Sequence, residues 1–207
     1  MFPLSTVLFP HAALPLHVFE QRYQALVADC LAGRGEFGVV LIERGSEVGG
    51  GDSRHSVGTI ARMELASPLP QGRWMLMTRG TRRLRVAEWL PDDPYPMAMV
   101  EELAPDDDGA DEGLLERATA SVRRARALLS ELGETPPMGT AVELGEDLDA
   151  AAWRLCALCP VTAHDGQRLL ETERTAERLR LVCSLADDVS EDLTRLLAEG
   201  GPPGSPG

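Results

Sequence analysis

The fold is decided by the stretch Leu14-Pro-Leu-His-Val-Phe-Glu-Gln-Arg-Tyr23, in which an extended apolar segment runs directly into an amphipathic helix. Leu14 to Val18 is short and apolar, as expected of an extended segment. From Phe19 onwards the apolar residues recur at the spacing of one helical face, and Gly33 and Gly35 end the helix. That face comprises Phe19, Tyr23, Leu26, Val27, Cys30 and Leu31. We therefore expect the sheet formed by the neighbouring segments to fold around this helix.

Further extended segments lie on both sides of the helix. Phe2 to Pro10 is apolar and bounded by prolines, whereas Phe37 to Ile42 is a run of β-branched and aromatic residues typical of a buried strand. Later segments alternate between apolar and polar residues, and Gly80 interrupts one of them, which predicts a bulge or a close backbone approach. The expected strands are residues 2–10, 37–42, 57–65, 74–79, 83–86 and 97–103. Five or six short strands in succession favour a closed or nearly closed barrel.

The pattern changes at the acidic stretch Pro105-Asp-Asp-Asp-Gly-Ala-Asp-Glu112, which predicts a solvated linker. Beyond it the apolar residues recur at helical spacing, the last such stripe running from Leu179 to Leu196 in steps of three and four. The tail, residues 200–207, contains only Gly, Pro and Ser. We therefore expect a β part over residues 1–104, a helical part over 113–199 and a disordered tail over 200–207.

Composition excludes several classes of chemistry. The 207 residues include no lysine, so the chain cannot form a P-loop, a Ser–Lys dyad or a pyridoxal Schiff base, all of which need one. A formal net charge of −13 opposes non-specific binding to nucleic acid or to anionic membranes. No apolar run is long enough for a membrane span and no secretion signal is recognisable, which predicts a cytoplasmic protein.

The order of these pieces resembles one family closely. Phe2-Pro-Leu, Val7-Leu-Phe-Pro10 and the stretch from Leu14 to Tyr23 are similar to the opening of the Lon protease N-terminal (substrate-binding) domain family, in particular its short stand-alone bacterial members. The resemblance continues through residues 37–42, 57–61, 80–86 and 167–171 and through Arg178-Leu179, and it covers most of residues 1–199. The sequence departs from the family at His11, where a glycine usually follows the Phe-Pro pair.

This resemblance implies a fold and a function. The fold would be α+β: a PUA-like small β-barrel with one inserted helix, followed by an α-helical C-terminal bundle. The function would be non-catalytic binding of unfolded or partner polypeptide in a proteolysis-related process, without the ATPase and Ser–Lys protease domains that full-length Lon carries. We therefore expect no enzymatic activity, no cofactor and a protein partner. Two alternatives remain open at this point, a hydrolase with an unrecognised active site and weak RNA binding.

The candidate peptide-binding site is the apolar N-terminal stretch, which has more apolar residues than one edge strand needs. If some of them stay exposed between the barrel and the helix, they would form a groove for an extended peptide. The candidate residues are Phe9, Pro10, Leu14, Pro15, Leu16, Phe19 and, at the rim, Arg22.

The RNA alternative depends on a local basic cluster, which comprises Arg79, Arg82, Arg83 and Arg85. PUA-like barrels that bind RNA motivate this hypothesis. However, the cluster has only four charges and few interleaved aromatic residues, and its arginines would pair with carboxylates on an ordinary solvated strand face.

The cysteines and histidines predict neither a metal site nor a catalytic residue. Cys156-Ala-Leu-Cys159 has the spacing of half a zinc site, but both cysteines, like Cys30 and Cys183, lie on or beside apolar helical stripes, where thiols act as small hydrophobes. No histidine lies in a recognised nucleophile motif. The stripe from Leu179 to Leu196 could serve a dimer, but the chain has other helices to cover it, so we expect a monomer.

Overall fold

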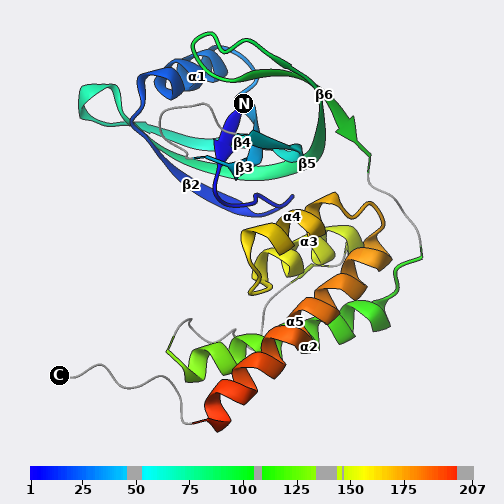
Figure 1. Cartoon of the computed structure of the whole chain (residues 1–207). Helices are drawn as coiled ribbons and strands as arrows, with labels where there is room; N and C mark the ends of the chain where they lie inside the picture. Colours follow the sequence, from blue (N-terminus) through cyan, green and yellow to red (C-terminus); the bar gives the residue numbers. More distant parts are fainter. Residues whose placement is uncertain (46–52, 105–108, 134–143, 146, 200–207) are drawn as a thin grey trace, which may run out of the picture. The chain divides into compact units, whose positions relative to one another are not determined.

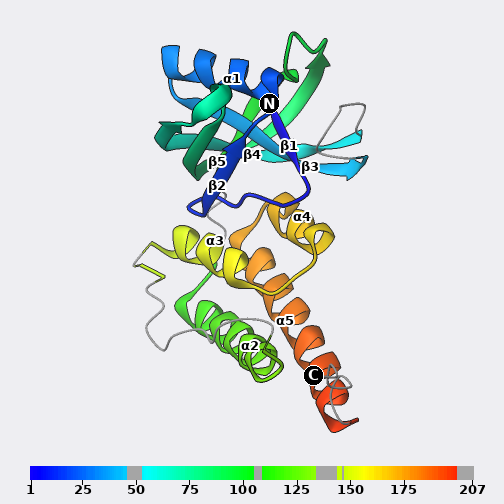
Figure 2. The same cartoon turned by 90° about the vertical axis from the view of Figure 1, so that its left-hand side faces the viewer.

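The computed structural model describes residues 1–45, 53–104, 109–133, 144–145 and 147–199. The chain forms two units, Met1–Pro105 and Asp106–Gly207 (Figures 1 and 2). The first, called here the β unit, holds the sheet, and the second, the helical unit, holds four of the five α-helices. The fold is therefore α+β, as expected. The predicted tail, and part of the predicted linker, lie outside the described residues.

The β unit is a six-stranded sheet with one α-helix and one short 3₁₀ helix in its described part. Its strands run in the order β1-β3-β4-β5-β2, and β6 also pairs with β5. The elements are β1 (Phe2–Leu4), β2 (Ala13–Val18), α1 (Gln21–Ala32), β3 (Glu36–Arg44), β4 (Ser53–Pro68), the 3₁₀ helix η1 (Pro70–Gly72), β5 (Trp74–Leu90) and β6 (Met97–Leu103).

The sheet is strongly curved but does not close through pairing of its end strands (Figure 1). β1 pairs only with β3, in parallel, and β2 pairs only with β5, in antiparallel orientation, over the described residues. Each of these two strands therefore has a free edge. A free edge presents backbone N–H and C=O groups that another extended segment can pair with.

Three of the predicted strands, residues 2–10, 74–79 and 83–86, were wrong in their boundaries. The strand expected over 2–10 is only β1, and a turn follows in which His11 has a φ of 63°. The two strands expected on either side of Gly80 are the single long strand β5. The chain continues through Gly80 because the ladder to β4 shifts its register there, between Ile60 and Ala61, instead of ending. The strands are correspondingly longer than expected.

The close backbone approach predicted at Gly80 is confirmed. A Cβ atom at this position would collide with the carbonyl oxygen of Phe9. Backbone hydrogen bonds hold the two segments together, since His11 N donates to Gly80 O at 2.8 Å and Gly80 N donates to Ala12 O at 2.9 Å. The glycine therefore lets the turn after β1 cross directly against β5, which places the start of β2.

Helix α1 packs its apolar face against the sheet. Tyr23, Leu26 and Val27 are buried, and they share one core with residues of β1, β2, β3 and β5. Gly35, at a φ of 70°, closes the helix by donating its N–H to Cys30 O at 2.9 Å. Phe19 was expected on the buried face of the helix but is exposed. The reason is that the helix begins only at Gln21, so Phe19 precedes it.

The helical unit contains α2 (Glu112–Glu131), α3 (Leu148–Leu158), α4 (Ala163–Glu171) and α5 (Thr175–Ala198). Helices α2 and α5 pack side by side (Figures 1 and 2). Side chains of Asp111, Asp147 and Thr162 accept hydrogen bonds from backbone N–H groups at the starts of α2, α3 and α4. The stripe on α5 is fully buried as far as Ala186, but Leu196 is exposed, so only its first half forms core.

In the part of the chain that is described, no helix combines the length and the apolar character needed to cross a bilayer.

Candidate functional site

A small groove in the β unit is lined by residues of β1, of β2 and of the turn into α1. Its volume is about 180 Å³. Strand β1 contributes Phe2 and Leu4, and the remaining lining comes from β2 and the turn into α1. The lining residues are Phe2, Leu4, Pro15, Leu16, His17, Val18, Phe19, Glu20 and Tyr23. The groove is therefore apolar over most of its lining and lies beside β2, an end strand of the sheet.

The sequence of β2 explains why its edge is free. Pro15 has no backbone N–H to donate to a ladder, and such a residue is tolerated in a sheet mainly on an edge strand. Successive side chains of a strand point to opposite faces, and Leu16 and Val18 are accordingly buried whereas Pro15 and His17 are exposed. Strand β2 thus contributes buried side chains to the core and exposed side chains to the surface at the groove.

Aromatic rings line the groove. The rings of Phe2 and Tyr23 stack with their centroids 4.1 Å apart and an interplanar angle of 12°. The Phe19 ring lies 6.0 Å from that of His17. The guanidinium of Arg22 lies over the Tyr23 ring at 4.5 Å, and its Nε donates to Glu20 Oε2 at 3.1 Å. The charged groups at this end of the groove are thus paired with each other.

An exposed apolar patch continues from the groove across the sheet. Pro15 lies opposite Met77 in the β2–β5 ladder, and Met77 lies opposite Leu65 in the β4–β5 ladder. His17 lies opposite Met75 in the same way. Cross-strand partners share one face of a sheet, so these side chains are neighbours. We define the apolar patch as Pro15, Phe19, Leu65, Met75 and Met77, of which the last four are 52, 61, 45 and 39% exposed.

The size and the apolar lining of the groove suit the binding of an apolar side chain. A protein cavity of about 150 Å³ lined by aliphatic and aromatic groups can hold benzene, so a groove of about 180 Å³ accommodates one large apolar side chain. Exposed apolar surface of this kind marks sites of contact with other molecules. Among the described residues, no group of three His, Cys, Asp or Glu side chains could hold a metal ion.

The structure brings together only part of the peptide-binding site expected from sequence. Pro15, Leu16 and Phe19 line the groove, and Arg22 is half-buried beside it. Phe9 and Pro10 are buried and contribute nothing to the groove, so their assignment was wrong. Leu14 also does not line it, since it packs against the core of the β unit, and Thr78 Oγ1 donates to its carbonyl at 2.8 Å.

Sequence reasoning missed Leu65, Met75 and Met77. The signal was present in residues 74–78, where Trp74 and Leu76 alternate with Met75 and Met77 so that both faces of the strand are apolar. Only one face of this strand can pack on the core. An apolar residue on the other face must therefore be exposed or covered by another molecule.

The arginine cluster that motivated the RNA alternative is largely matched by carboxylates. Arg79 Nε donates to Glu64 at 2.6 Å, and Arg82 pairs with Glu36 at 3.1 Å and with Glu102 at 2.9 Å. Hydrogen bonds from Arg82 and Arg62 hold the pKa of Glu36 below its usual value. Arg83 is buried and Arg82 is half-buried, which leaves Arg79 and Arg85 exposed. This arrangement is the ordinary solvated strand face, and it offers no concentrated positive surface to a phosphate backbone.

The thiols are placed as small hydrophobes. Cys156 and Cys159 are buried, and burial raises the pKa of each to about 12. Burial also raises the pKa of Cys30 and of Cys183. Reactive cysteines need the opposite shift, toward a stable thiolate. The two Cys of the Cys-X-X-Cys pair thus lie in an environment that disfavours nucleophilic chemistry.

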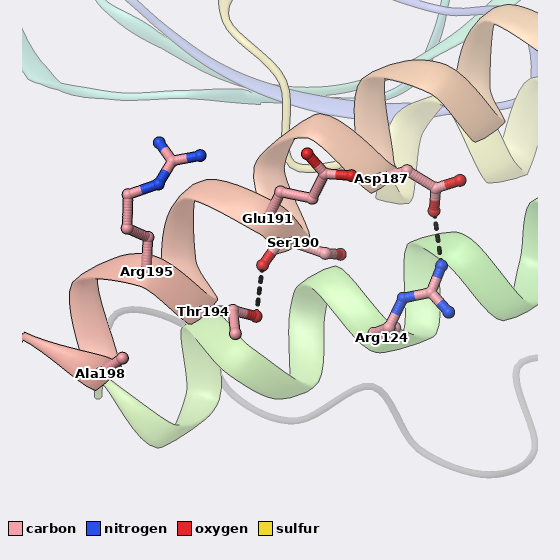
Figure 3. A pocket seen from close by; sticks show the side chains of 7 residues that line it. All are labelled: Arg124, Asp187, Ser190, Glu191, Thr194, Arg195 and Ala198. Atoms are coloured by element: carbon pink, nitrogen blue, oxygen red, sulfur yellow. Dashed lines mark hydrogen bonds and ion pairs between the residues drawn. The ribbon is translucent and has the colours of Figure 1, made fainter.

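A larger depression of about 600 Å³ lies between α2 and α5 in the helical unit (Figure 3). Its lining residues are Arg124, Asp187, Ser190, Glu191, Thr194, Arg195 and Ala198. Most of its polar groups have partners within the unit, since Arg124 pairs with Asp187 at 2.6 Å and the Ser190 and Thr194 hydroxyls donate to backbone carbonyls one turn earlier. It therefore fits an apolar ligand less well than the groove in the β unit.

Comparison with known proteins points to one family. The family model described as the ATP-dependent protease La (LON) substrate-binding domain matches residues 1–188. The chain is 29% identical over 195 residues to Lon protease 2 of Herpetosiphon aurantiacus, and 31% identical over 184 residues to the Lon protease of Desulfovibrio desulfuricans. These alignments cover 91% and 86% of this chain but only 24% and 20% of the proteases.

Solved structures agree. The crystal structure of a Lon N-terminal domain protein from Xanthomonas campestris is 30% identical, has a TM-score of 0.66, and covers 88% of this chain and 95% of its own. The N-terminal domain of the Mycobacterium avium complex Lon protease, at 20% identity and a TM-score of 0.59, shares the fold. The matched region contains both the groove and the apolar patch.

Proposed function

The chain belongs to the Lon substrate-binding domain family, and from this premise we propose that it binds extended apolar segments of polypeptide through the groove and the apolar patch of the β unit. The single observation that carries the proposal is the apolar patch, which brings four large apolar side chains to the surface next to an unpaired strand edge. The folding of an acidic domain does not explain why this much apolar surface is exposed to water, so we infer that another molecule covers it.

The binding mode follows from the free edge of β2. An incoming segment in extended conformation adds to that edge through backbone hydrogen bonds, which are independent of its sequence. One of its large apolar side chains enters the groove between Leu4 and Pro15, and others lie over Met75 and Met77. Methionine suits this purpose because its flexible, polarizable side chain adapts to different partners.

Binding without catalysis is part of the same proposal. The chain has no lysine, so neither an ATPase of the P-loop type nor a Ser–Lys protease can be built from it. The chain spans about a quarter of the length of the curated Lon proteases that it matches. We propose that it recognises clients of proteolysis or a protein partner, and that any cleavage is carried out by other catalytic domains. A cytoplasmic location remains a prediction from the sequence.

The proposal is tested by placing a charge in the apolar patch. We expect Met75→Glu and Met77→Glu each to weaken binding of a short uncharged apolar peptide by roughly tenfold, which corresponds to about 1.4 kcal/mol. The reason is that the new carboxylate must lose water when the peptide covers it. Fluorescence anisotropy with a labelled peptide measures the affinity.

Met99→Glu is the matched control. Met99 is the same residue type, is 57% exposed and lies on β6, outside the apolar patch. Its substitution should leave the affinity unchanged. Equal weakening by all three variants, or undiminished binding by Met75→Glu and Met77→Glu, would contradict the proposed surface.

A further inference from the structure

The methionines of the β unit differ sharply in their exposure. The chain has seven, and the three exposed ones in the described residues are Met75, Met77 and Met99. Two of the three lie in the apolar patch, on adjacent outward positions of one strand. Between and beyond them, Leu76 and Thr78 point the other way and are buried. The apolar patch is thus built partly from methionine, whose apolar side chain is converted to a polar one by mild oxidants.

The neighbours of these two methionines leave their side chains exposed, at 45% for Met75 and 39% for Met77. Met77 lies between Pro15 and Leu65 across the two ladders, and Met75 lies between His17 and Ser67. Of these, Leu65, Pro15 and His17 are themselves exposed. A small oxidant can therefore reach both thioethers without any opening of the fold.

We propose that Met75 and Met77 are an oxidation site through which peroxide switches off the binding of apolar segments. This inference rests on the function proposed above. In the reaction a lone pair of the thioether sulfur attacks one oxygen of hydrogen peroxide, the S–O bond forms and the O–O bond breaks. The sulfur is oxidised by two electrons to the sulfoxide, and the remaining peroxide oxygen is reduced and leaves as water.

The sulfoxide changes the patch in the direction that opposes binding. Its S–O group is strongly polar and accepts hydrogen bonds from water, whereas the thioether that it replaces is apolar. An apolar segment that covers the oxidised patch must strip this water without offering a donor in return. The fold itself is little affected, because neither side chain belongs to the buried core. Methionine sulfoxide reductases reverse the modification, so binding can be restored.

The test uses the full chain, treated with hydrogen peroxide and freed of it before a labelled, methionine-free apolar peptide is added. We expect mass spectrometry to find sulfoxide at both positions and anisotropy to show affinity reduced by roughly tenfold. Treatment with methionine sulfoxide reductases should restore it. The double variant Met75→Leu and Met77→Leu lacks both thioethers, so its affinity, whatever its value before treatment, should be the same after peroxide.

Met99→Leu serves as the second variant, since it removes an exposed methionine outside the patch and should stay sensitive to peroxide. The inference is overturned if the double variant loses affinity as wild type does, if sulfoxide at both positions leaves the affinity unchanged, or if the two positions resist oxidation while Met99 is oxidised. Absence of peptide binding before any peroxide treatment is a different result. It overturns the proposed function, and the switch with it.

Discussion

His11 stands where the resemblance to the family leads one to expect a glycine, and the structure gives this difference a physical meaning. Its φ of 63° lies in the left-handed region, which glycine adopts freely and other residues only with strain. The family's usual glycine at this position is thus explained by the turn between β1 and β2. A hydrogen bond from His11 N to Gly80 O holds the backbone of His11 in this conformation.

Replacing His11 tests this strain directly. We expect His11→Gly to be more stable than His11→Ala by about 1 kcal/mol, because both remove the imidazole but only glycine relieves the left-handed backbone. Chemical denaturation of the two variants measures the difference in free energy of unfolding. Equal stability of the two would show that the turn can relax and that the backbone is not strained.

Tyr95 offers a second test at the scale of one residue. Its hydroxyl donates to Asp29 Oδ2 at 2.7 Å, and this bond to a carboxylate raises the pKa of Tyr95 to about 12. The folded-state pKa is above the ordinary value of 10, so the bond stabilises the fold below pH 10 and is lost as the pH rises from about 10 to about 12. An ultraviolet titration, with Tyr95→Phe to assign the signal, should place its ionisation at about 12 and show it fall in Asp29→Asn. An unchanged midpoint in Asp29→Asn would remove the assigned cause.

At the scale of elements, the local sequence pattern predicted which residues of a segment are buried better than which are exposed. The helix after Leu14 to Val18 was predicted because Tyr23, Leu26 and Val27 recur at helical spacing, and these are the residues that α1 buries. Phe19 was assigned to the same face because periodicity does not reveal where a helix begins. Phe19 is one of the two residues between β2 and α1. Its exposure depends on the conformation of this short turn, which no repeating pattern encodes.

Strand β5 shows why the candidate site was only half predictable. The alternation in residues 74–79 predicts a strand but assigns no face to the core when both faces are apolar. The assignment comes from pairing, since β2 and β4 flank β5 and their register places Met77 between Pro15 and Leu65. Register is a non-local property, and the apolar patch therefore becomes visible only in the structure.

Within the helical unit, Arg178 is the side chain that joins separate elements most directly. Its guanidinium is buried, lies 3.5 Å from the centroid of the Trp153 ring of α3, and donates to the carbonyls of Thr172 and Glu173 that precede α5. A planar group with several donors can satisfy these contacts at once. The start of α5 is thereby fixed against α3.

We expect Arg178→Lys to lower the free energy of unfolding by roughly 2 kcal/mol, because lysine keeps the charge but cannot stack flat on the indole or reach both carbonyls. Arg180→Lys, two residues along the same helix at an exposed position, is the matched control and should change little. Thermal or denaturant unfolding monitored by circular dichroism measures both. A loss of similar size in the control would show that the helix is sensitive to arginine in general.

At the scale of the whole molecule, the helical unit and the β unit differ in the surfaces that they expose. The helical unit has its own core, with Ala118, Leu155 and Val182 fully buried, and the depression between α2 and α5 is lined mainly by charged and hydroxyl residues. The β unit combines the groove, the free edge of β2 and the apolar patch. We therefore propose that polypeptide is recognised by the β unit. The monomeric state expected for the chain stays a prediction, and a dimer through the α5 stripe would form at its exposed end, at Leu196.

The central claim is that the groove and the apolar patch are where polypeptide binds, and an NMR titration of the isotope-labelled protein with a short apolar peptide tests it most directly. The account predicts that amide shifts change along β2, at Phe19, and in the facing stretches of β4 and β5 around Leu65 and Met77. Methyl signals of Met75 and Met77 should shift with the same affinity, while that of Met99 stays in place. Shifts confined to α2 and α5 around Asp187, or no saturable shifts at all, would contradict it.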